Sequence, residues 1–236
     1  ALKNKYAPVY VFKGDCYLAQ RDPGKACENY EQAIYFDKNS KDAYIKYARA
    51  YKDVNTDLAI QKLNELKALD PTFSLANEEL AKLYYDKNRF PEAVKAFADY
   101  VASGNDTNED LIEYCMALLM NGQYQDCLDI AKKGLARSPN NFVLNRMAMY
   151  STIELKDYAS ADQYAATFLN TVTDKRLISY FDYLYLGRLY DADKKYNDAA
   201  QAFENAIKKD TTKYTFYKQV SDAYESAGNY KASVDA

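Results

Sequence analysis

The sequence predicts an all-α fold built from tandem repeats, in which antiparallel helix pairs stack into a solenoid. Three observations predict this fold. Small residues recur along the chain in a column of nearly constant spacing, and a second column follows the first in phase. Glycine (7 residues) and proline (5 residues) are also too scarce for a chain with many β-turns. Internal similarity at a fixed period of about 20–50 residues is the signature of a repeat array.

The first column has successive spacings of 34, 33, 34, 34, 38 and 34 residues. Its members are Gly14, Ala48, Ala81, Cys115, Met149, Gly187 and Ser221. The second column lies twelve residues further on, or eleven in one repeat, at Ala26, Ala59, Ala93, Cys127, Ala161, Ala199 and Ser233. Two columns that keep the same phase over seven repeats define the repeat unit.

Each repeat has the period of a helix and not that of a strand. In the third repeat the apolar residues fall at spacings of three and four, at Leu80, Ala81, Tyr84, Ala93, Phe97 and Tyr100. The polar segment 86–89 separates the two halves. Each repeat is therefore predicted to be two antiparallel helices with a short loop. Large aromatic residues such as Tyr84 are expected to be buried between successive pairs.

The columns divide the chain into one array over residues 1–236. The predicted repeats cover residues 7–39, 40–73, 74–107, 108–141, 142–178 and 180–213, followed by an incomplete repeat at 214–236. Four extra residues between Asn170 and Ile178 predict a longer loop or an extended helix. Repeat arrays normally end in a polar capping helix. Because none is visible near Ala1 or Ala236, we expect the chain to be a segment of a longer protein.

The repeat resembles the tetratricopeptide repeat, whose unit has about 34 residues. The sixth repeat is the most similar, with Tyr183, Leu186, Gly187, Tyr190, Tyr196, Ala199, Phe203 and Ala206 in phase. The fifth departs from the pattern, with Met149 at the glycine position and Thr152 at the tyrosine position. The resemblance implies a right-handed α-α superhelix whose concave face is lined by the first helix of each repeat. It implies little about function, because such repeats are scaffolds of unrelated proteins.

Helical spacing from the first column selects the residues expected to line that concave face. They form an apolar patch of Tyr85, Ile112, Met116, Leu119, Tyr150 and Ile153, surrounded by Arg49, Lys82, Arg146 and Arg188. An apolar centre with a charged rim is typical of a binding site for a protein or peptide. We interpret the patch as a site for a segment with hydrophobic anchors and acidic flanks. The alternative is that these residues pack against neighbouring helices.

Catalysis, cofactors and metals are not predicted. Histidine is absent, and Cys16, Cys27, Cys115 and Cys127 have no CxxC spacing. We expect Cys115 and Cys127 to be buried thiols and not a disulfide. The acidic pairs Glu78-Glu79 and Glu109-Asp110 are not accompanied by a nucleophile, a glycine-rich phosphate loop or a cluster of metal ligands. The chain is therefore not expected to be an enzyme.

The composition also limits the class of partner. The net charge of −3 argues against nucleic acid, and no apolar run approaches the roughly 20 residues that span a bilayer. Tetratricopeptide repeats that clamp the C-terminal carboxylate of chaperones need an asparagine in the central groove row. That row lies one residue after the first column and here consists of Asp15, Arg49, Lys82, Met116, Tyr150, Arg188 and Asp222. Because none of these is asparagine, we expect no such clamp.

The predicted function is a scaffold that binds a protein or peptide partner in its concave groove. Two alternatives remain open. The chain could be an architectural or assembly subunit, or a spacer, in a bacterial envelope complex. It could also be a regulatory or substrate-recruiting region of an enzyme that lies outside this segment. The sequence does not decide between a cytoplasmic and an exported location, and it does not identify the partner.

Overall fold

The computed structural model describes residues 6–212 and 216–235, and all regular structure in these ranges is helical. The chain divides into two compact units, which we call the N-terminal unit (Ala1–Ala117) and the C-terminal unit (Leu118–Ala236). The ends of the array that bear on capping, at Ala1 and Ala236, lie outside the described residues.

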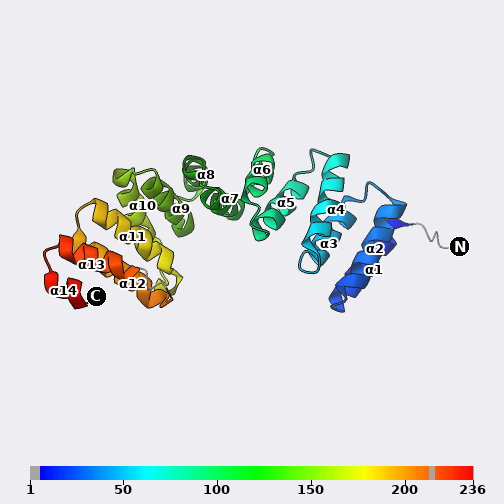
Figure 1. The fold of residues 1–236 in the computed structure, drawn as a ribbon. Coiled ribbons are helices and arrows are strands. Elements are labelled where there is room, and N and C mark those ends of the chain that lie inside the picture. Colours follow the sequence, from blue (N-terminus) through cyan, green and yellow to red (C-terminus); the bar gives the residue numbers. More distant parts are fainter. Residues whose placement is uncertain (1–5, 213–215, 236) are drawn as a thin grey trace. The chain divides into compact units, whose positions relative to one another are not determined.

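The helices follow one another at short intervals (Figure 1). In the N-terminal unit they are α1 (Ala7–Ala19), α2 (Pro23–Phe36), α3 (Lys41–Tyr51), α4 (Thr56–Leu69), α5 (Ser74–Asp86) and α6 (Phe90–Val101). The helix α7 (Asn108–Met120) crosses the division between the units. In the C-terminal unit they are α8 (Tyr124–Arg137), α9 (Phe142–Glu154), α10 (Tyr158–Thr171), α11 (Tyr180–Ala192), α12 (Tyr196–Lys209), α13 (Tyr217–Ser226) and α14 (Tyr230–Asp235).

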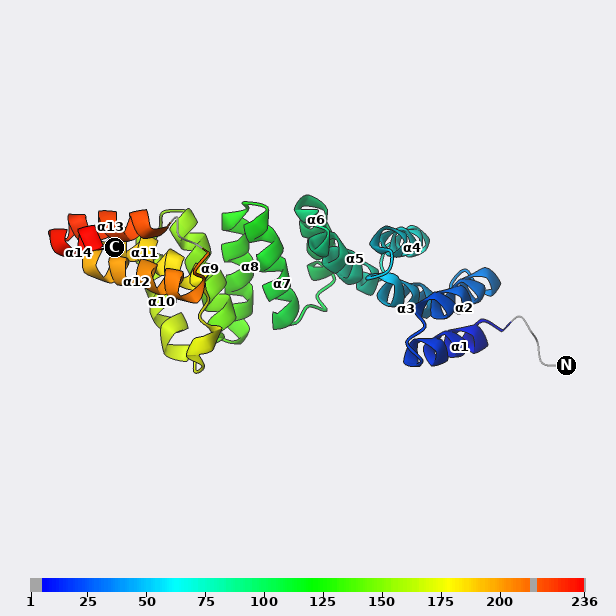
Figure 2. The same ribbon diagram turned by 60° about the horizontal axis from the view of Figure 1, so that its bottom comes forward.

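Successive helices pack against each other within each unit, as α1 and α2 do in Figures 1 and 2. Helices one repeat apart also touch: α1 contacts α3, α3 contacts α5, and α9 contacts α11. This is the packing of a repeat array, in which each helix pair buries its faces against its neighbours. The all-α fold predicted from the small-residue columns is confirmed.

The loop inside the repeat has a recurring backbone conformation. Seven residues after the first column the backbone has a positive φ, at Arg21, Asn88, Gly122, Lys156, Lys194 and Gly228. Asn55 stands at this position in the second repeat, where its φ is −151° and its side chain accepts a hydrogen bond from the Leu58 amide as the N-cap of α4. The second repeat is the one with a spacing of eleven residues, so the missing residue shortens this loop.

In the first and sixth repeats a ring from the second helix packs closely against the first helix. Tyr30 of α2 and Phe203 of α12 are buried, and their rings lie where a Cβ at Gly14 or Gly187 would stand, 2.3 Å and 2.4 Å away. Only glycine permits this approach of ring to backbone. Tyr84, which was expected to be buried, is instead partly exposed, with the Arg89 guanidinium 4.7 Å above its ring. That prediction was wrong because a tyrosine near the helix end can reach solvent.

The extra residues after the fifth repeat form a loop and not a longer helix. The helix α10 ends at Thr171, and a single turn of 3₁₀-helix, η1 (Lys175–Leu177), precedes α11. Ser179 caps α11 through a capping box, in which its hydroxyl accepts from the Asp182 amide while Asp182 accepts from the Ser179 amide. The loop thus places Asp182 at the start of α11, where it is completely buried.

Candidate functional site

Part of the predicted groove forms a pocket in the N-terminal unit, with a volume of about 330 Å³. Three first helices contribute to it: Lys52 caps the end of α3, Lys82 and Tyr85 lie on α5, and Met116 lies on α7. Phe97 of α6 lines it from the second helix of the third repeat. Met116 is 37% exposed, so an apolar side chain faces solvent at a concave place.

The charge around this pocket is arranged about Lys82. Its Nζ lies 2.6 Å from Glu78 Oε1 and 3.5 Å from Glu113 Oε2. Burial opposes the charged form of Lys82, but the hydrogen bond with Glu78 and the charge of Glu113 raise its pKa. Burial raises the pKa of Glu113, which Lys82 offsets only in part. The ammonium group of Lys82 therefore pairs with two carboxylates, those of Glu78 and Glu113, beside the pocket.

The start of α7 is fixed by a buried carboxylate. Asp110 Oδ2 accepts hydrogen bonds from the Thr107 amide and hydroxyl, both at 2.8 Å, and from the Tyr100 hydroxyl at 3.1 Å. Burial, followed by the charges of Glu78 and Asp110, raises the pKa of Tyr100 to about 12. The Phe97 ring stacks on Tyr114 with centroids 5.6 Å apart. These contacts of Asp110 and Tyr114 fix the position of α7, the helix that carries Met116.

Two predicted residues of the N-terminal unit lie outside the pocket. Arg49 is exposed, and its Nε donates to Glu79 Oε1 at 2.7 Å. Ile112 is half-buried. On the remainder of α7, Leu119 is also half-buried.

The predicted site residues of the C-terminal unit bind one another instead of lining a pocket. Arg146 Nε lies 2.8 Å from Oδ1 of the buried Asp182, as an ion pair that is not aligned as a hydrogen bond, and its Nη2 donates to the Leu177 carbonyl at 2.7 Å. The Tyr150 hydroxyl donates to the same Asp182 oxygen at 2.7 Å. This cluster ties α9 to the loop and to the start of α11.

A second cluster adjoins it. The Tyr150 ring stacks on Tyr185 with centroids 4.2 Å apart. Tyr185 and Arg188 both donate to Glu154 Oε1, at 2.8 Å and 2.7 Å. The hydrogen bond from Arg188 is the main cause that lowers the pKa of Glu154.

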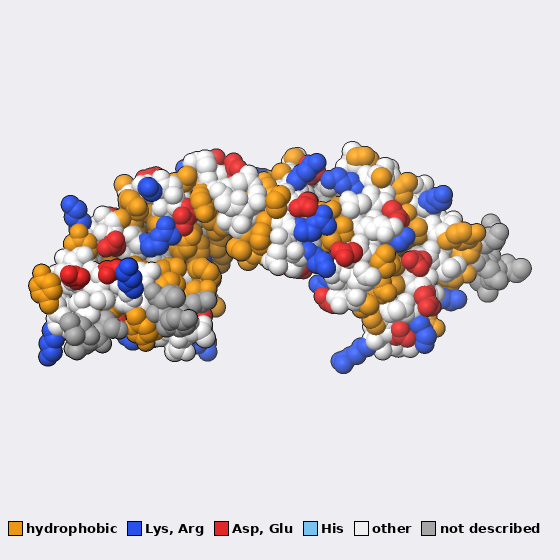
Figure 3. All heavy atoms as spheres, in the orientation of Figure 1, with side chains coloured by type: hydrophobic (Ala, Val, Ile, Leu, Met, Phe, Trp, Pro, Cys, Tyr) orange, Lys and Arg blue, Asp and Glu red, His pale blue; other side chains and the backbone are white. Residues whose placement is uncertain are grey.

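Burial limits what these residues can offer a partner. Tyr150 is 9% exposed and Ile153 only 1%. Tyr150 of α9 contacts Tyr185 and Asp182 of α11, so its burial favours the alternative that these residues pack against neighbouring helices, while the binding patch itself stays a prediction. All four predicted rim cations, Arg49, Lys82, Arg146 and Arg188, are paired with carboxylates. The face of the N-terminal unit seen in Figure 3 accordingly shows basic and acidic side chains intermixed.

Sequence reasoning missed several residues of these sites. Glu113 lies three residues before Met116, on the same helix face, so helical spacing could have found it. Asp182 stands three residues after Ser179, which is the sequence signature of a capping box. Its pairing with Arg146 has no such local signal, because the partner lies on another repeat.

The described residues contain no group of three or more His, Cys, Asp or Glu side chains that could hold a metal ion. Their helices are all too short or too polar to cross a membrane. Cys27, Cys115 and Cys127 are buried, and Cys16 is exposed.

The chain is similar to known proteins in sequence and in fold. The model of the tetratricopeptide repeat matches residues 7–40. A tetratricopeptide repeat and J domain-containing co-chaperone of Cryptococcus neoformans is 23% identical over 152 residues, which are 59% of this chain and 29% of the co-chaperone. The chain thus spans less than a third of that relative.

Three solved structures share the fold at low sequence identity. The C-terminal part of a repeat-containing protein of Cytophaga hutchinsonii is 17% identical with a TM-score of 0.68, covering 91% of this chain and 87% of its own. PilF of Pseudomonas aeruginosa is 17% identical with a TM-score of 0.63, covering 90% and 95%. YrrB, described as having an unusual peptide-binding site, is 16% identical with a TM-score of 0.65, covering 80% and 96%.

This fold is a scaffold type that generally serves protein–protein interaction and does not itself supply catalytic groups. The family match, the in-phase columns and the shared helical architecture lead to one conclusion: the chain contains a tetratricopeptide repeat at residues 7–40 and has the all-α fold of tetratricopeptide-repeat proteins.

Proposed function

We propose that this protein binds a segment of a partner protein, and that the segment lies over the pocket of Lys52, Lys82, Tyr85 and Met116 in the N-terminal unit. The observation that carries the proposal is the exposed Met116 in a pocket of about 330 Å³ to which three successive first helices contribute. A concave apolar spot surrounded by charged side chains suits an apolar anchor of a partner.

The structure changes the chemistry that we expect of this partner. The sequence suggested acidic flanks, because four basic residues surround the patch. In the N-terminal unit Arg49 and Lys82 already bind carboxylates. The apolar anchor is therefore the main recognition element in this proposal, and acidic flanks are not required.

The C-terminal unit has a different role in this proposal. Its equivalent side chains form hydrogen bonds and an ion pair with each other, which favours a supporting role over a binding role. This observation gives limited support to the architectural alternative. The co-chaperone relative joins tetratricopeptide repeats to a J domain in one protein. A recruiting role beside another domain is compatible with the proposal, since a recruiting region also acts by binding.

The test is a comparison of two methionine substitutions on α7. Met116→Glu places a charge in the pocket, whereas Met120→Glu makes the same change at a 58% exposed residue outside it. Proteins captured from the source cell by the immobilised wild-type chain are identified, and their affinities for both variants are measured after purification. We expect Met116→Glu to weaken binding about tenfold or more, as for a central anchor contact, and Met120→Glu to leave it unchanged. Full affinity for Met116→Glu would contradict the proposal.

A further inference from the structure

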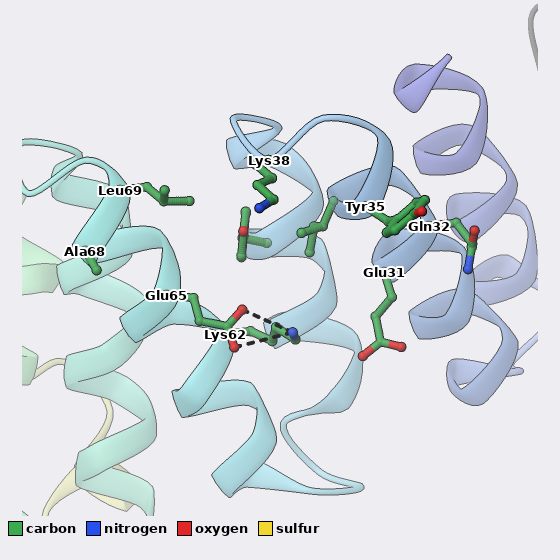
Figure 4. Close-up of a pocket in the computed structure, with 10 residues that line it drawn as sticks. Glu31, Gln32, Tyr35, Lys38, Lys62, Glu65, Ala68 and Leu69 are labelled. Atoms are coloured by element: carbon green, nitrogen blue, oxygen red, sulfur yellow. Dashed lines mark hydrogen bonds and ion pairs between the residues drawn. The ribbon is translucent and has the colours of Figure 1, made fainter. Parts of the chain in front are cut away.

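The largest pocket described lies elsewhere, between the second helices α2 and α4 of the N-terminal unit (Figure 4). Its volume is about 690 Å³. The helix α2 contributes Glu31, Gln32, Ile34 and Tyr35, the following connection contributes Lys38, α3 contributes Tyr44, and α4 contributes Lys62, Glu65, Ala68 and Leu69. No residue of this pocket lines the pocket at Met116, so the two sites are distinct.

One end of this pocket is apolar and exposed. Tyr35 is 75% exposed and Leu69 is 50% exposed, and they face the pocket from opposite helices. Single apolar side chains on a surface are common, but two large ones across one concavity can hold an apolar side chain between them. Tyr44 of α3 also lines the pocket and is buried, which raises the pKa of its hydroxyl.

The positive charge of Lys38 and the negative charge of Glu31 lie at opposite ends of this pocket. Figure 4 shows Lys38 between Tyr35 and Leu69, and Glu31 with the Lys62–Glu65 pair at the other end. Lys62 Nζ lies 3.1 Å from Glu65 Oε2, and Gln61 Nε2 donates to Glu65 Oε1 at 3.1 Å. Across the described residues, no carboxylate lies within ion-pair distance of Lys38. The apolar end therefore carries an uncompensated positive charge, and the opposite end carries the charge of Glu31.

We infer that this pocket is a second docking site, which takes an amphipathic segment of a partner protein. An apolar side chain of the segment lies between Tyr35 and Leu69, and a carboxylate beside it pairs with Lys38. A basic residue further along the segment faces Glu31. The wall on α4 runs from Lys62 to Leu69, about 10 Å at the rise of an α-helix, so a segment of two helical turns fills the pocket. Helix-in-groove binding uses such anchors with complementary charges.

The probe is an alanine-based peptide of about 12 residues, with Glu beside Phe near one end and Lys two turns later. Its counterpart has Glu and Lys exchanged. Each is titrated into the isotope-labelled full chain, and binding is followed by amide chemical shifts. We expect the first peptide to shift the signals of Tyr35, Lys38 and Leu69, and to bind about two- to fivefold tighter than its counterpart, the worth of one exposed ion pair.

Two variants decide the matter. Lys38→Glu should reverse the preference between the peptides, and Tyr35→Ala should weaken binding of both about tenfold. Both residues are exposed, so unchanged circular dichroism is expected for the variants. The matched control is Lys95→Glu, on the exposed surface of α6, which should leave the preference as in the wild type. The inference is overturned if neither peptide shifts signals of α2 and α4, or if Lys38→Glu keeps the original preference. Shifts confined to Lys82 and Met116 would overturn it too, while leaving the function proposed above untouched.

Discussion

The third and fifth repeats differ in charge at one equivalent position, which lies three residues before the first-column residue. This position is Glu78 in the third repeat and Arg146 in the fifth. The next repeat in each case begins its first helix with a buried capping aspartate, five residues before the first-column residue. This aspartate is Asp110 in the fourth repeat and Asp182 in the sixth. Arg146 can pair with the aspartate of the next repeat and does so at 2.8 Å. Glu78 cannot pair with Asp110, because both are acidic.

The groove faces of these two repeats also differ in what surrounds the two side chains. In the C-terminal unit the Arg146–Asp182 pair recruits Tyr150, and the first-helix face is closed by its own side chains. In the N-terminal unit Glu78 binds Lys82, and a pocket with an exposed Met116 remains. The same repeat position thus carries a base where the groove face is closed and an acid where a pocket remains.

The largest expected effect comes from breaking the closed face. Arg146→Met leaves Asp182 buried without its cation, and loss of one member of a buried ion pair costs about 3–5 kcal/mol. Urea denaturation followed by circular dichroism measures the loss. The control is Arg49→Met, whose half-exposed pair with Glu79 should contribute less than about 1 kcal/mol. Equal losses of unfolding free energy for the two variants would mean that the Arg146–Asp182 pair contributes no more to stability than a surface ion pair.

Tyr150→Phe removes only the hydroxyl that donates to Asp182. A hydrogen bond to a charged group contributes about 1.5–3 kcal/mol, so we expect a loss of stability in that range. Tyr85→Phe makes the same change in the open groove, where no hydrogen bond of the hydroxyl is described, and should leave the free energy of unfolding unchanged. A Tyr150→Phe variant as stable as Tyr85→Phe would contradict the closed-face interpretation.

The helix-pair cores should not differ between the two units. Gly14→Ala and Gly187→Ala each place a Cβ within 3.0 Å of a buried ring, and overpacking costs about 1–3 kcal/mol. Similar losses in melting temperature are expected for both. Gly24→Ala, whose Cβ would meet nothing nearer than 3.6 Å, should not destabilise the chain. A loss at only one of Gly14 and Gly187 would show that the difference between the units reaches their cores.

The smallest effect is a contrast in pH dependence. Burial raises the pKa of Glu113 above its ordinary value of 4.5, so its contribution to stability is present below pH 4.5 and is lost as pH rises through the folded-state pKa. The hydrogen bond from Arg188 lowers the pKa of Glu154, so its contribution is present above pH 4.5 and is lost as pH falls through the folded-state pKa.

Carboxyl carbon NMR titrations of the wild type, assigned with Glu113→Gln and Glu154→Gln, measure both values. We expect the Glu113 midpoint above that of a glutamate in an unstructured peptide and the Glu154 midpoint below it. If the titration midpoints of Glu113 and Glu154 were both above, or both below, that of a glutamate in an unstructured peptide, the expected difference in pH dependence between the two groove faces would be contradicted.

Particular residues show how far the sequence could be interpreted. The spacing of Gly14 and Ala26 predicted a helix pair, and α1 and α2 occupy that place. Helical spacing also selected Lys82, Tyr85 and Met116, which the pocket brings together. Tyr150 has an equally good position in the pattern, yet it is buried. Its state depends on Asp182, which lies 32 residues away on another helix.

The sequence by itself determined the periodic features of this protein: helix pairs, their phase, the shortened loop of the second repeat and the insertion after the fifth. These follow from local sterics and from the need to bury one face of each helix, which repeat along the chain. Only the tertiary structure decided which inward-facing side chains are available to a partner. Whether a side chain is available depends on its contacts with side chains of other repeats, such as the contact of Arg146 with Asp182. A spacing rule treats every repeat alike, so it contains no information about these contacts.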